Sequence, residues 1–206
     1  MNHIFATRFS HFAPPPNSPA QTPPLPFVDP LFKRRLSQVS RMTIQVVHDV
    51  LQESDGEPPK LVFVSFRGEL GRQLKINRGL VKDAEVTPAN FSLSVFNTPP
   101  AVATIALGMR AGYTAVFPGD DDFYAGLLSA CAPVLSGAEE RVIFAYADEA
   151  VPDEYRPVFH GADGDPLAFA CVLSAQRSEG AVELDVSGRA EAFFSPRAFL
   201  SLLCPS

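Results

Sequence analysis

The sequence predicts an α/β fold in which a mixed five-stranded sheet is layered with helices. Residues 61–66 (LVFVSF) and 141–147 (RVIFAYA) are short, almost continuously apolar and rich in β-branched or aromatic side chains, as is typical of strands covered on both faces. Residues 33–53 instead repeat apolar side chains at steps of three and four, the pattern of an amphipathic helix. A chain of 206 residues with 46% hydrophobic content can bury roughly 70% of its unfolded surface, so we expect one domain with its own core.

The chain opens with three segments of different character. Residues 1–13 contain enough apolar and aromatic side chains for a first strand. Residues 14–32 hold eight prolines, which exclude a helix or a central strand and predict an extended covering loop, although a proline-rich ligand for a partner protein is the alternative. Residues 33–206 form the remainder of the domain, beginning with the amphipathic helix.

The middle of the chain alternates strands and helices. After strand 61–66, a turn at Arg67, Gly68 and Glu69 leads into a helix that ends near Lys82. A second helix, rich in small residues, runs from Thr98 to Met109, and strand 113–117 follows it. Gly119 then makes a tight turn into a helix headed by three aspartates. A strand, a glycine turn and a helix N-terminus together form the arrangement with which many α/β enzymes present a nucleophile.

The C-terminal part predicts strands and turns. Strands 167–175 and 181–186 are joined through residues 178–180 and are expected to pair as a hairpin. Ser195 and Pro196 begin a short helix that ends near Leu203. Between His160 and Asp165 the chain has the Asp-Gly pairs of a turn and lacks the ligand spacing of a calcium-binding loop, so no metal site is expected there.

Composition excludes several classes of function. A formal net charge of -6 argues against nucleic acid as a partner, because phosphate binding requires concentrated Lys and Arg. No run approaches the roughly 20 apolar residues of a membrane span. The three cysteines, Cys131, Cys171 and Cys204, are far apart and lie in or beside apolar segments, which favours unreactive thiols in a reducing cytoplasm over disulfides or a zinc site. We expect a cytoplasmic protein without a cofactor.

Three short motifs carry a resemblance to a known family. They are RRLS at Arg34–Ser37, S-x-x-GEL at Ser65–Leu70, and FSLSVFN at Phe91–Asn97. With these motifs the chain resembles the N-terminal half of the β-ketoacyl synthases of the thiolase fold. It is most similar to the short ketosynthase-like or chain-length-factor-like proteins of bacterial aryl polyene pathways, in which the position of Phe96 is usually a histidine.

The resemblance implies a subunit that does not catalyse condensation alone. An ungapped comparison from Asn97 onward puts Asp120, preceded by Gly119, at the place of the catalytic cysteine, and the half of the fold that carries two further basic residues is absent. The resemblance therefore implies a chain-length-factor-like protein that forms a heterodimer with a full-length ketosynthase and shapes its acyl tunnel, and that also meets an acyl carrier protein.

The resemblance also implies which residues carry these contacts. Tyr113, Thr114, Ala115, Val116 and Phe117 are expected to form the dimer seam. The residues expected to face the acyl tunnel and the partner are Asn90, Phe91, Phe96 and Asn97, and those expected to attract an acidic carrier protein are Lys33, Arg34 and Arg35. Core packing for the aromatic residues and a solvated helix face for the basic ones remain open alternatives.

Two other functions stay open from the sequence. Asp120, Asp122 and Glu69 could be the working groups of a stand-alone acyl-transferring or hydrolytic enzyme, although the aspartates equally fit the cap and first turn of a helix. The alternation of strands and helices also allows a flavodoxin-like binding domain, for which a glycine-rich phosphate loop is missing.

Overall fold

A computed structural model describes residues 3–52, 56–158 and 164–204. Its strands form one six-stranded sheet with the order β3-β2-β4-β5-β1-β6. The strands are β1 (His3–Phe12), β2 (Lys60–Val64), β3 (Tyr113–Val116), β4 (Arg141–Asp148), β5 (Leu167–Ser174) and β6 (Val182–Asp185). The α/β class is confirmed, and the sheet has six strands where five were expected.

The sheet is mixed because its strands are parallel in one half and antiparallel in the other. β3, β2 and β4 are parallel neighbours, whereas β5 runs antiparallel to β4 and to β1. The predicted hairpin of strands 167–175 and 181–186 is wrong, since β1 lies between β5 and β6 and pairs with both. The flavodoxin-like alternative is also wrong, because antiparallel pairs join β5 and β6 to their neighbours and the sheet is not an all-parallel one.

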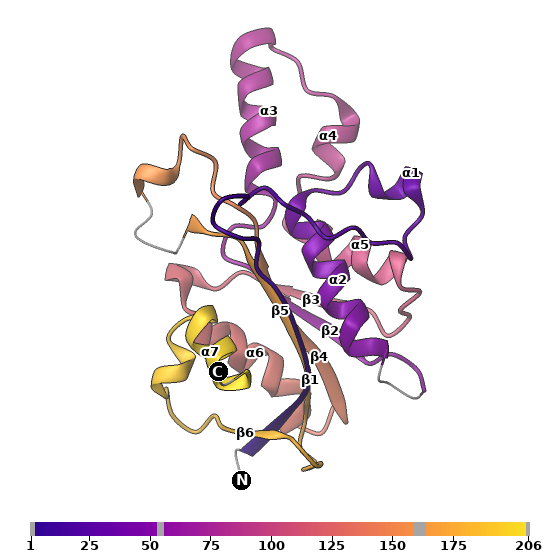
Figure 1. Cartoon of the computed structure of the whole chain (residues 1–206), viewed down its shortest axis with the longest axis vertical. Coiled ribbons are helices and arrows are strands. Elements are labelled where there is room, and N and C mark those ends of the chain that lie inside the picture. Colours follow the sequence, from indigo (N-terminus) through magenta and orange to yellow (C-terminus); the bar gives the residue numbers. More distant parts are fainter. Residues whose placement is uncertain (1–2, 53–55, 159–163, 205–206) are drawn as a thin grey trace.

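The α-helices lie on both faces of the sheet and beyond one end of it (Figure 1). They are α1 (Pro30–Lys33), α2 (Gln38–Gln52), α3 (Leu70–Asp83), α4 (Pro88–Ser92), α5 (Thr98–Ala106), α6 (Phe123–Leu135) and α7 (Pro196–Leu203). The helix expected over residues 33–53 is α2 and begins later than expected, at Gln38, while α1 is a separate short helix that Asp29 caps. α4 is a short helix in the segment between the helices expected to end near Lys82 and to begin at Thr98. No helix of the described residues is long and apolar enough to cross a membrane.

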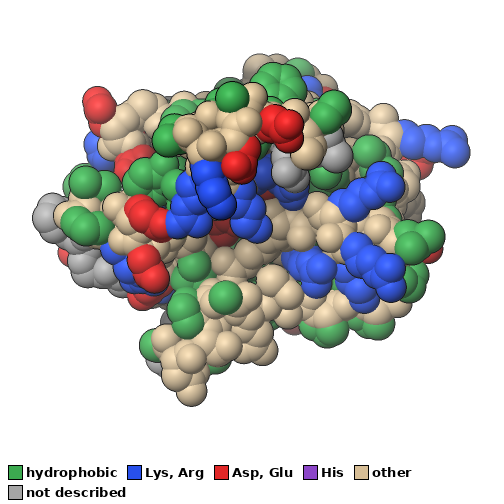
Figure 2. Space-filling model, turned by 90° about the horizontal axis from the view of Figure 1, so that it is seen from above, with side chains coloured by type: hydrophobic (Ala, Val, Ile, Leu, Met, Phe, Trp, Pro, Cys, Tyr) green, Lys and Arg blue, Asp and Glu red, His purple; other side chains and the backbone are tan. Residues whose placement is uncertain are grey.

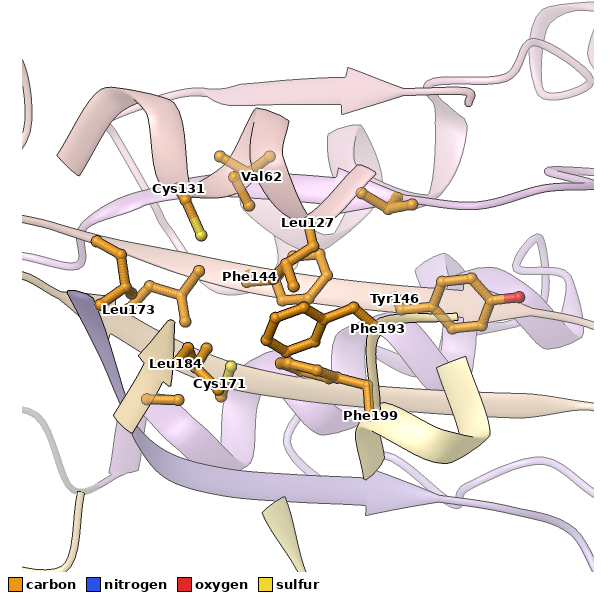
Figure 3. Close-up of a cluster of buried hydrophobic side chains, with 14 of the residues drawn as sticks. Val62, Leu127, Cys131, Phe144, Tyr146, Cys171, Leu173, Leu184, Phe193 and Phe199 are labelled. Carbon is orange, nitrogen blue, oxygen red and sulfur yellow. The ribbon is translucent and has the colours of Figure 1, made fainter. Parts of the chain in front are cut away.

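Two hydrophobic clusters hold the layers together. α6 and α7 cover one face, where Phe123, Phe144, Phe169 and Phe199 are fully buried and lie ring against ring. Figure 3 shows this cluster, with the sulfur atoms of Cys131 and Cys171 among apolar side chains. α2 and α5 cover the other face, and Leu25 of the proline-rich segment is completely buried there, as a covering loop requires.

α3 and α4 stand apart from these layers. They project past the end of the sheet at which β2 finishes (Figure 1), and no residue of α3 is buried. Leu80 and Val81 are exposed on α3, as are Phe91 on α4 and Val95 just after it. We call α3 and α4 the projecting arm. The apolar side chains of this arm are exposed to solvent and contribute little to the core.

Candidate functional site

The carboxyl ends of β2 and β4 meet in a buried polar network centred on Asp148. The Asp148 carboxylate accepts hydrogen bonds from the Ser65 hydroxyl at 2.6 Å, the Tyr146 hydroxyl at 2.5 Å and the backbone N–H of Arg67 at 3.0 Å. The Arg67 guanidinium lies 3.5 Å from the same carboxylate, and Asp148 is fully buried. Burial, followed by the charge of Asp148, raises the pKa of Tyr146 well above its ordinary value, so this tyrosine stays a donor.

The motifs that carried the resemblance meet beside this network. Glu69 of the S-x-x-GEL motif accepts hydrogen bonds from the hydroxyls of Ser37 at 2.7 Å and Ser40 at 2.8 Å, and pairs with Arg72 at 3.2 Å. Ser37 is the last residue of the RRLS motif. Glu69 is only 1% exposed. Its role is therefore to fasten the start of α2 to the start of α3.

A second buried acid joins the same helices to β4. Glu149 accepts a hydrogen bond from the backbone N–H of Gly71 at 2.7 Å. Burial raises the pKa of Glu149 to about 7, the N–H groups of Gly71 and Val39 lower it in part, and the charge of Glu69 raises it further. A side chain at position 71 would meet this carboxylate, because a Cβ atom there would lie 3.1 Å from Oε1.

The turn after β3 carries carboxylates at the place where the resemblance expects a nucleophile, and its left-handed residues are aspartates instead of Gly119. Pro118 is extended, residues 119–121 form a 3-10 turn, and Asp120 has φ 54° and ψ 30°, a left-handed conformation. Asp121 is left-handed as well, with φ 52°. Such conformations cost energy for residues other than glycine, least for Asp and Asn. Asp120 and Asp121 are both exposed.

The third aspartate of the turn has a structural task. Oδ1 of Asp122 accepts hydrogen bonds from the backbone N–H groups of Tyr124 and Ala125, which caps α6, and it pairs with Arg189 at 3.0 Å. This is the cap that the sequence allowed. No group of three or more His, Cys, Asp or Glu side chains in the described part of the chain is arranged to hold a metal ion.

No cysteine among the described residues lies on this turn. Cys131 is buried in α6, and burial raises its pKa to about 12. Burial likewise raises the pKa of Cys171 in β5. Cys204 is exposed, directly after α7. The two buried thiols therefore stay protonated at neutral pH and are poor nucleophiles.

A pocket of about 340 Å³ opens beside the turn. Asp121 lines it together with Phe66, Arg67 and Tyr146 from the ends of β2 and β4. Phe194, Ser195, Pro196 and Arg197, which precede and begin α7, close its other side. The pocket thus connects the turn after β3 to the buried network around Asp148, and its lining contains aromatic and charged side chains.

The residues expected to face a partner occupy different environments. Phe96 is half-buried, with its ring edge-to-face against Phe117 at 4.7 Å and packed over Gly68, where a Cβ atom would lie 2.9 Å from the ring. Phe91 is 64% exposed. Asn97 is exposed and donates a hydrogen bond to the Tyr113 hydroxyl at 2.9 Å. Asn90 lies in α4, and its side chain falls outside the described residues, as do His160 and Asp163 of the expected turn.

β3 is the edge strand of the sheet, with β2 as its only neighbour among the described strands. The N–H groups of Leu61 and Ser65 bond to the carbonyls of Gly112 and Val116. Because backbone groups alternate along a parallel strand, Thr114 and Val116 face β2, and Tyr113, Ala115 and Phe117 direct their N–H and C=O groups to the open side. Phe117 is 56% exposed.

The basic residues of the first motif lie near the projecting arm. Nζ of Lys33 donates to the carbonyls of Pro24 and Leu25, whereas Arg34 and Arg35 beside it are exposed. Arg72 of α3 donates to the carbonyl of Arg35 at 2.9 Å, which brings the two basic segments together. Figure 2 looks onto the end of the molecule from which α3 projects and shows Lys and Arg side chains gathered on this face.

Comparison with known proteins identifies the family. Residues 10–195 match the β-ketoacyl synthase N-terminal domain, which is nine-tenths of the chain. The chain belongs to this family. A comparison with curated protein sequences finds no match.

Solved structures show that this ketosynthase-like chain has the thiolase-type fold. A ketosynthase in complex with its chain length factor from Xenorhabdus doucetiae superposes with a TM-score of 0.71 at 22% identity, over 85% of this chain and 80% of that one. The matched chain of that complex is thus about as long as this one. The ishigamide ketosynthase/chain length factor matches with a TM-score of 0.59 at 15% identity, over 73% of this chain and 47% of that one.

A β-ketoacyl synthase from Burkholderia phymatum STM815 gives a TM-score of 0.57 at 13% identity, over 75% of this chain and 45% of its own. The ketosynthase-like chain spans about half the length of these two longer proteins. The expected single thiolase-like half is therefore the fold of this chain.

Sequence reasoning missed the centre of the buried network. Asp148 and Glu149 follow a strongly apolar strand, and an acid in that position is a signal for a polar network at a strand end. Glu69 was a candidate for chemistry, but its burial and three partners leave it no access to a substrate.

Proposed function

We propose that this ketosynthase-like chain is a non-catalytic, chain-length-factor-like subunit that pairs with a full-length β-ketoacyl synthase and shapes its acyl tunnel. The observation that carries the proposal is the turn after β3, where Asp120, the residue that the resemblance aligns with the nucleophile, is left-handed and exposed. A carboxylate is a far weaker nucleophile toward a thioester than a thiolate. The turn can therefore contribute its shape and its negative charge to a complex, but not a nucleophile for condensation.

The open side of β3 supports a paired state. Tyr113, Ala115 and Phe117 present outward backbone groups along an edge that is neither charged nor covered by another described strand. An exposed strand edge of this kind is stabilised by pairing with another strand. We infer that β3 meets the equivalent strand of the ketosynthase, with Thr114 and Val116 remaining bonded to β2.

The exposed apolar side chains extend this surface. Phe117 lies beside the strand edge at 56% exposure, and Phe91 and Val95 of the projecting arm are 64% and 46% exposed. Phe96 connects the two regions, because it touches Phe117 and packs over Gly68. Large side chains that are absent from the core and grouped around one edge are typical of an interface.

Phe91 and Phe96 have different parts in this proposal. Phe96 is held by its neighbours and forms a fixed wall, whereas Phe91 projects into solvent and can enter a partner's pocket. Bulk inserted at the far end of an acyl tunnel limits the length of the chain that fits, since a filled pocket rejects additional methylene groups. On the resemblance of the three motifs, we assign this role to aryl polyene biosynthesis or a related polyketide or fatty-acid-like pathway.

The basic residues support contact with an acyl carrier protein. Arg34 and Arg35 lie at the surface, and Lys75 and Lys82 follow Arg72 along α3 in a chain whose net charge is -6. Segregated positive charge on an acidic protein attracts an acidic partner and speeds its approach. Lys33 belongs to this group by position, although its ammonium holds the proline-rich segment.

The enzyme alternative receives less support from the same geometry. Glu69 is buried and has three partners, and Asp122 caps α6 while pairing with Arg189. Of the three carboxylates in that hypothesis, Asp120 alone is exposed and has no structural hydrogen bond to another described side chain. Turnover by the isolated chain that disappears in Asp120→Asn with folding intact would establish the enzyme and overturn the proposal.

The pairing is tested with variants of the strand edge. Ala115→Pro removes one outward N–H group and leaves the bonds of β3 to β2 in place, while Ala115→Ser keeps the N–H group and is the matched control. We expect the wild type and Ala115→Ser to co-purify with the cognate ketosynthase as a heterodimer, measured by light scattering after size exclusion, and Ala115→Pro to lose it. A wild-type chain that stays monomeric beside the ketosynthase contradicts the proposal.

The tunnel role is tested in the reconstituted pair. Phe91→Ala removes the exposed ring, and Val81→Ala, on the neighbouring helix α3, is the control for lost apolar surface. We expect Phe91→Ala to lengthen the products without dissolving the pair, as read by mass spectrometry of the released acyl chains. An unchanged product distribution would remove Phe91 from the tunnel.

A further inference from the structure

Three arginines converge in a pocket far from the turn after β3. Arg8 of β1, Arg141 at the start of β4 and Arg177 after β5 line a cavity of about 380 Å³. Arg141 begins the strand whose other end carries Asp148, so the pocket lies at the opposite end of the sheet from the candidate site. None of its residues belongs to the proposed interface.

A break in the sheet aims Arg8 at this place. β1 has an irregularity between Thr7 and Ser10, which pair with Val172 and Ala170 of β5, so β1 contains one residue more than β5 in this interval. Arg8 itself is left-handed, with φ 55°. Bulges redirect side chains, and left-handed residues other than glycine persist where the surrounding structure holds them.

The Arg8 guanidinium is incompletely satisfied. Its Nη1 atom is buried and has no hydrogen-bond partner among the residues that the structure describes. A buried guanidinium nitrogen without an acceptor is unfavourable, and an anion in the adjoining cavity would supply that acceptor. This atom is the observation that distinguishes the pocket from an ordinary basic surface.

The other polar groups of the pocket suit an anion. Ser174 and Ser178 line it, and the Ser174 oxygen accepts a hydrogen bond from the N–H of Gln176, which leaves its own proton for a ligand. Glu179 is the one acid among the described residues of the lining. Arg8 and Arg177 together carry more N–H donors than this carboxylate can accept, which suits the oxygens of a phosphate group.

We propose that this pocket binds the phosphoryl groups of a small phosphorylated molecule. Arginine presents a planar set of donors that fits phosphate oxygens bidentately. The cavity is larger than one phosphate and falls within the range of small-molecule sites, so a pyrophosphate or a phosphate ester with a small organic group fits its size. The site is independent of the pairing proposed above, because it shares no residue with it.

The test uses inorganic pyrophosphate and isothermal titration calorimetry on the full chain at about 150 mM salt, where weak surface contacts are screened. The variants are Arg8→Gln and Arg177→Gln, and the control is Arg110→Gln, an exposed arginine before β3 that does not line the pocket. We expect saturable binding that each pocket variant weakens at least tenfold and that the control leaves unchanged. Arg177 is exposed, so we expect Arg177→Gln to fold and to show the effect on pyrophosphate binding even if Arg8→Gln does not fold.

Two results would overturn the proposal. One is a dissociation constant for pyrophosphate that is the same in the wild type and in Arg177→Gln, or no binding at all. The other is binding only to vesicles that contain phosphatidic acid, measured by co-sedimentation, which would assign the arginines to a lipid surface. Binding of pyrophosphate in solution with no preference for such vesicles supports a small-molecule site.

Discussion

Glu149→Gln tests the physical state of the buried network. Glu149 is 6% exposed, and burial raises its pKa from 4.5 to about 7. Between these values the folded chain holds a proton that the unfolded chain has released, so the free energy of unfolding falls as pH rises through this window. A difference of about 2.5 between the two pKa values corresponds to a loss of about 3 kcal/mol between pH 4.5 and pH 8.

The glutamine variant removes this dependence. The amide that replaces the carboxyl cannot ionise, and its carbonyl oxygen can still accept the N–H of Gly71. Any fixed cost of the amide is the same at each pH and drops out of the comparison. We therefore expect the stability of Glu149→Gln relative to the wild type to improve by about 2.5 kcal/mol from about pH 5 to about pH 8.

Urea unfolding at intervals of about one pH unit across this range measures the effect through the midpoint and slope of each transition. Glu140→Gln, at an exposed glutamate before β4, is the control for a lost surface charge. Parallel stability curves for the wild type and Glu149→Gln would refute the reasoning, because the carboxyl would then be equally charged in both folded and unfolded chains.

Three further substitutions probe the parts that position the turn. Asp148→Ala removes the acceptor of the buried Ser65 and Tyr146 hydroxyls and the carboxylate that faces Arg67, and we expect a loss of about 3–5 kcal/mol in urea unfolding. Asp122→Ala removes the cap of α6 and should cost about 1 kcal/mol, whereas Asp120→Asn, which tolerates the left-handed turn, should stay within about 0.5 kcal/mol. Gly126→Ala would place a Cβ atom 2.8 Å from a valine methyl of β2, and we expect it to lower stability by about 1–3 kcal/mol while Gly188→Ala, with open space around it, does not. A wild-type stability for Asp148→Ala would contradict the role of its hydrogen bonds. Equal stabilities for Asp122→Ala and Asp120→Asn, or for Gly126→Ala and Gly188→Ala, would contradict the cap or the close contact.

The layers of the fold could be predicted from the sequence because their signals are local. The apolar runs at 61–66 and 141–147 became β2 and β4, and Ser195 with Pro196 began α7 as expected. The pairing of strands could not be predicted in the same way. A short loop before Val182 suits a hairpin, and nothing near it shows that the first strand of the chain occupies the place beside β5.

In the candidate site, too, features with local sequence signals could be predicted and those that depend on distant partners could not. The cap at Asp122 could be located from the spacing of strand, glycine and helix, whereas the role of Asp120 stays a prediction. The roles of Glu69 and Asp148 depend on partners far away in the sequence, such as Ser37 and Ser65, and no local pattern contains them. Which side of an aromatic residue faces water is also a property of the assembled fold, as the contrast between Phe91 and Phe96 shows.

The place of β1 between β5 and β6 has a consequence for the order in which the protein assembles. Phe5 pairs with Ser174 on one side and Glu183 on the other, so β1 has no partner strand until β5 and β6 have been synthesised about 160 residues later. At about 5–20 residues per second, that delay lasts roughly 10–30 seconds. During it, Ile4, Ala6 and Phe9 are open to wrong partners, and contacts so distant in sequence form slowly.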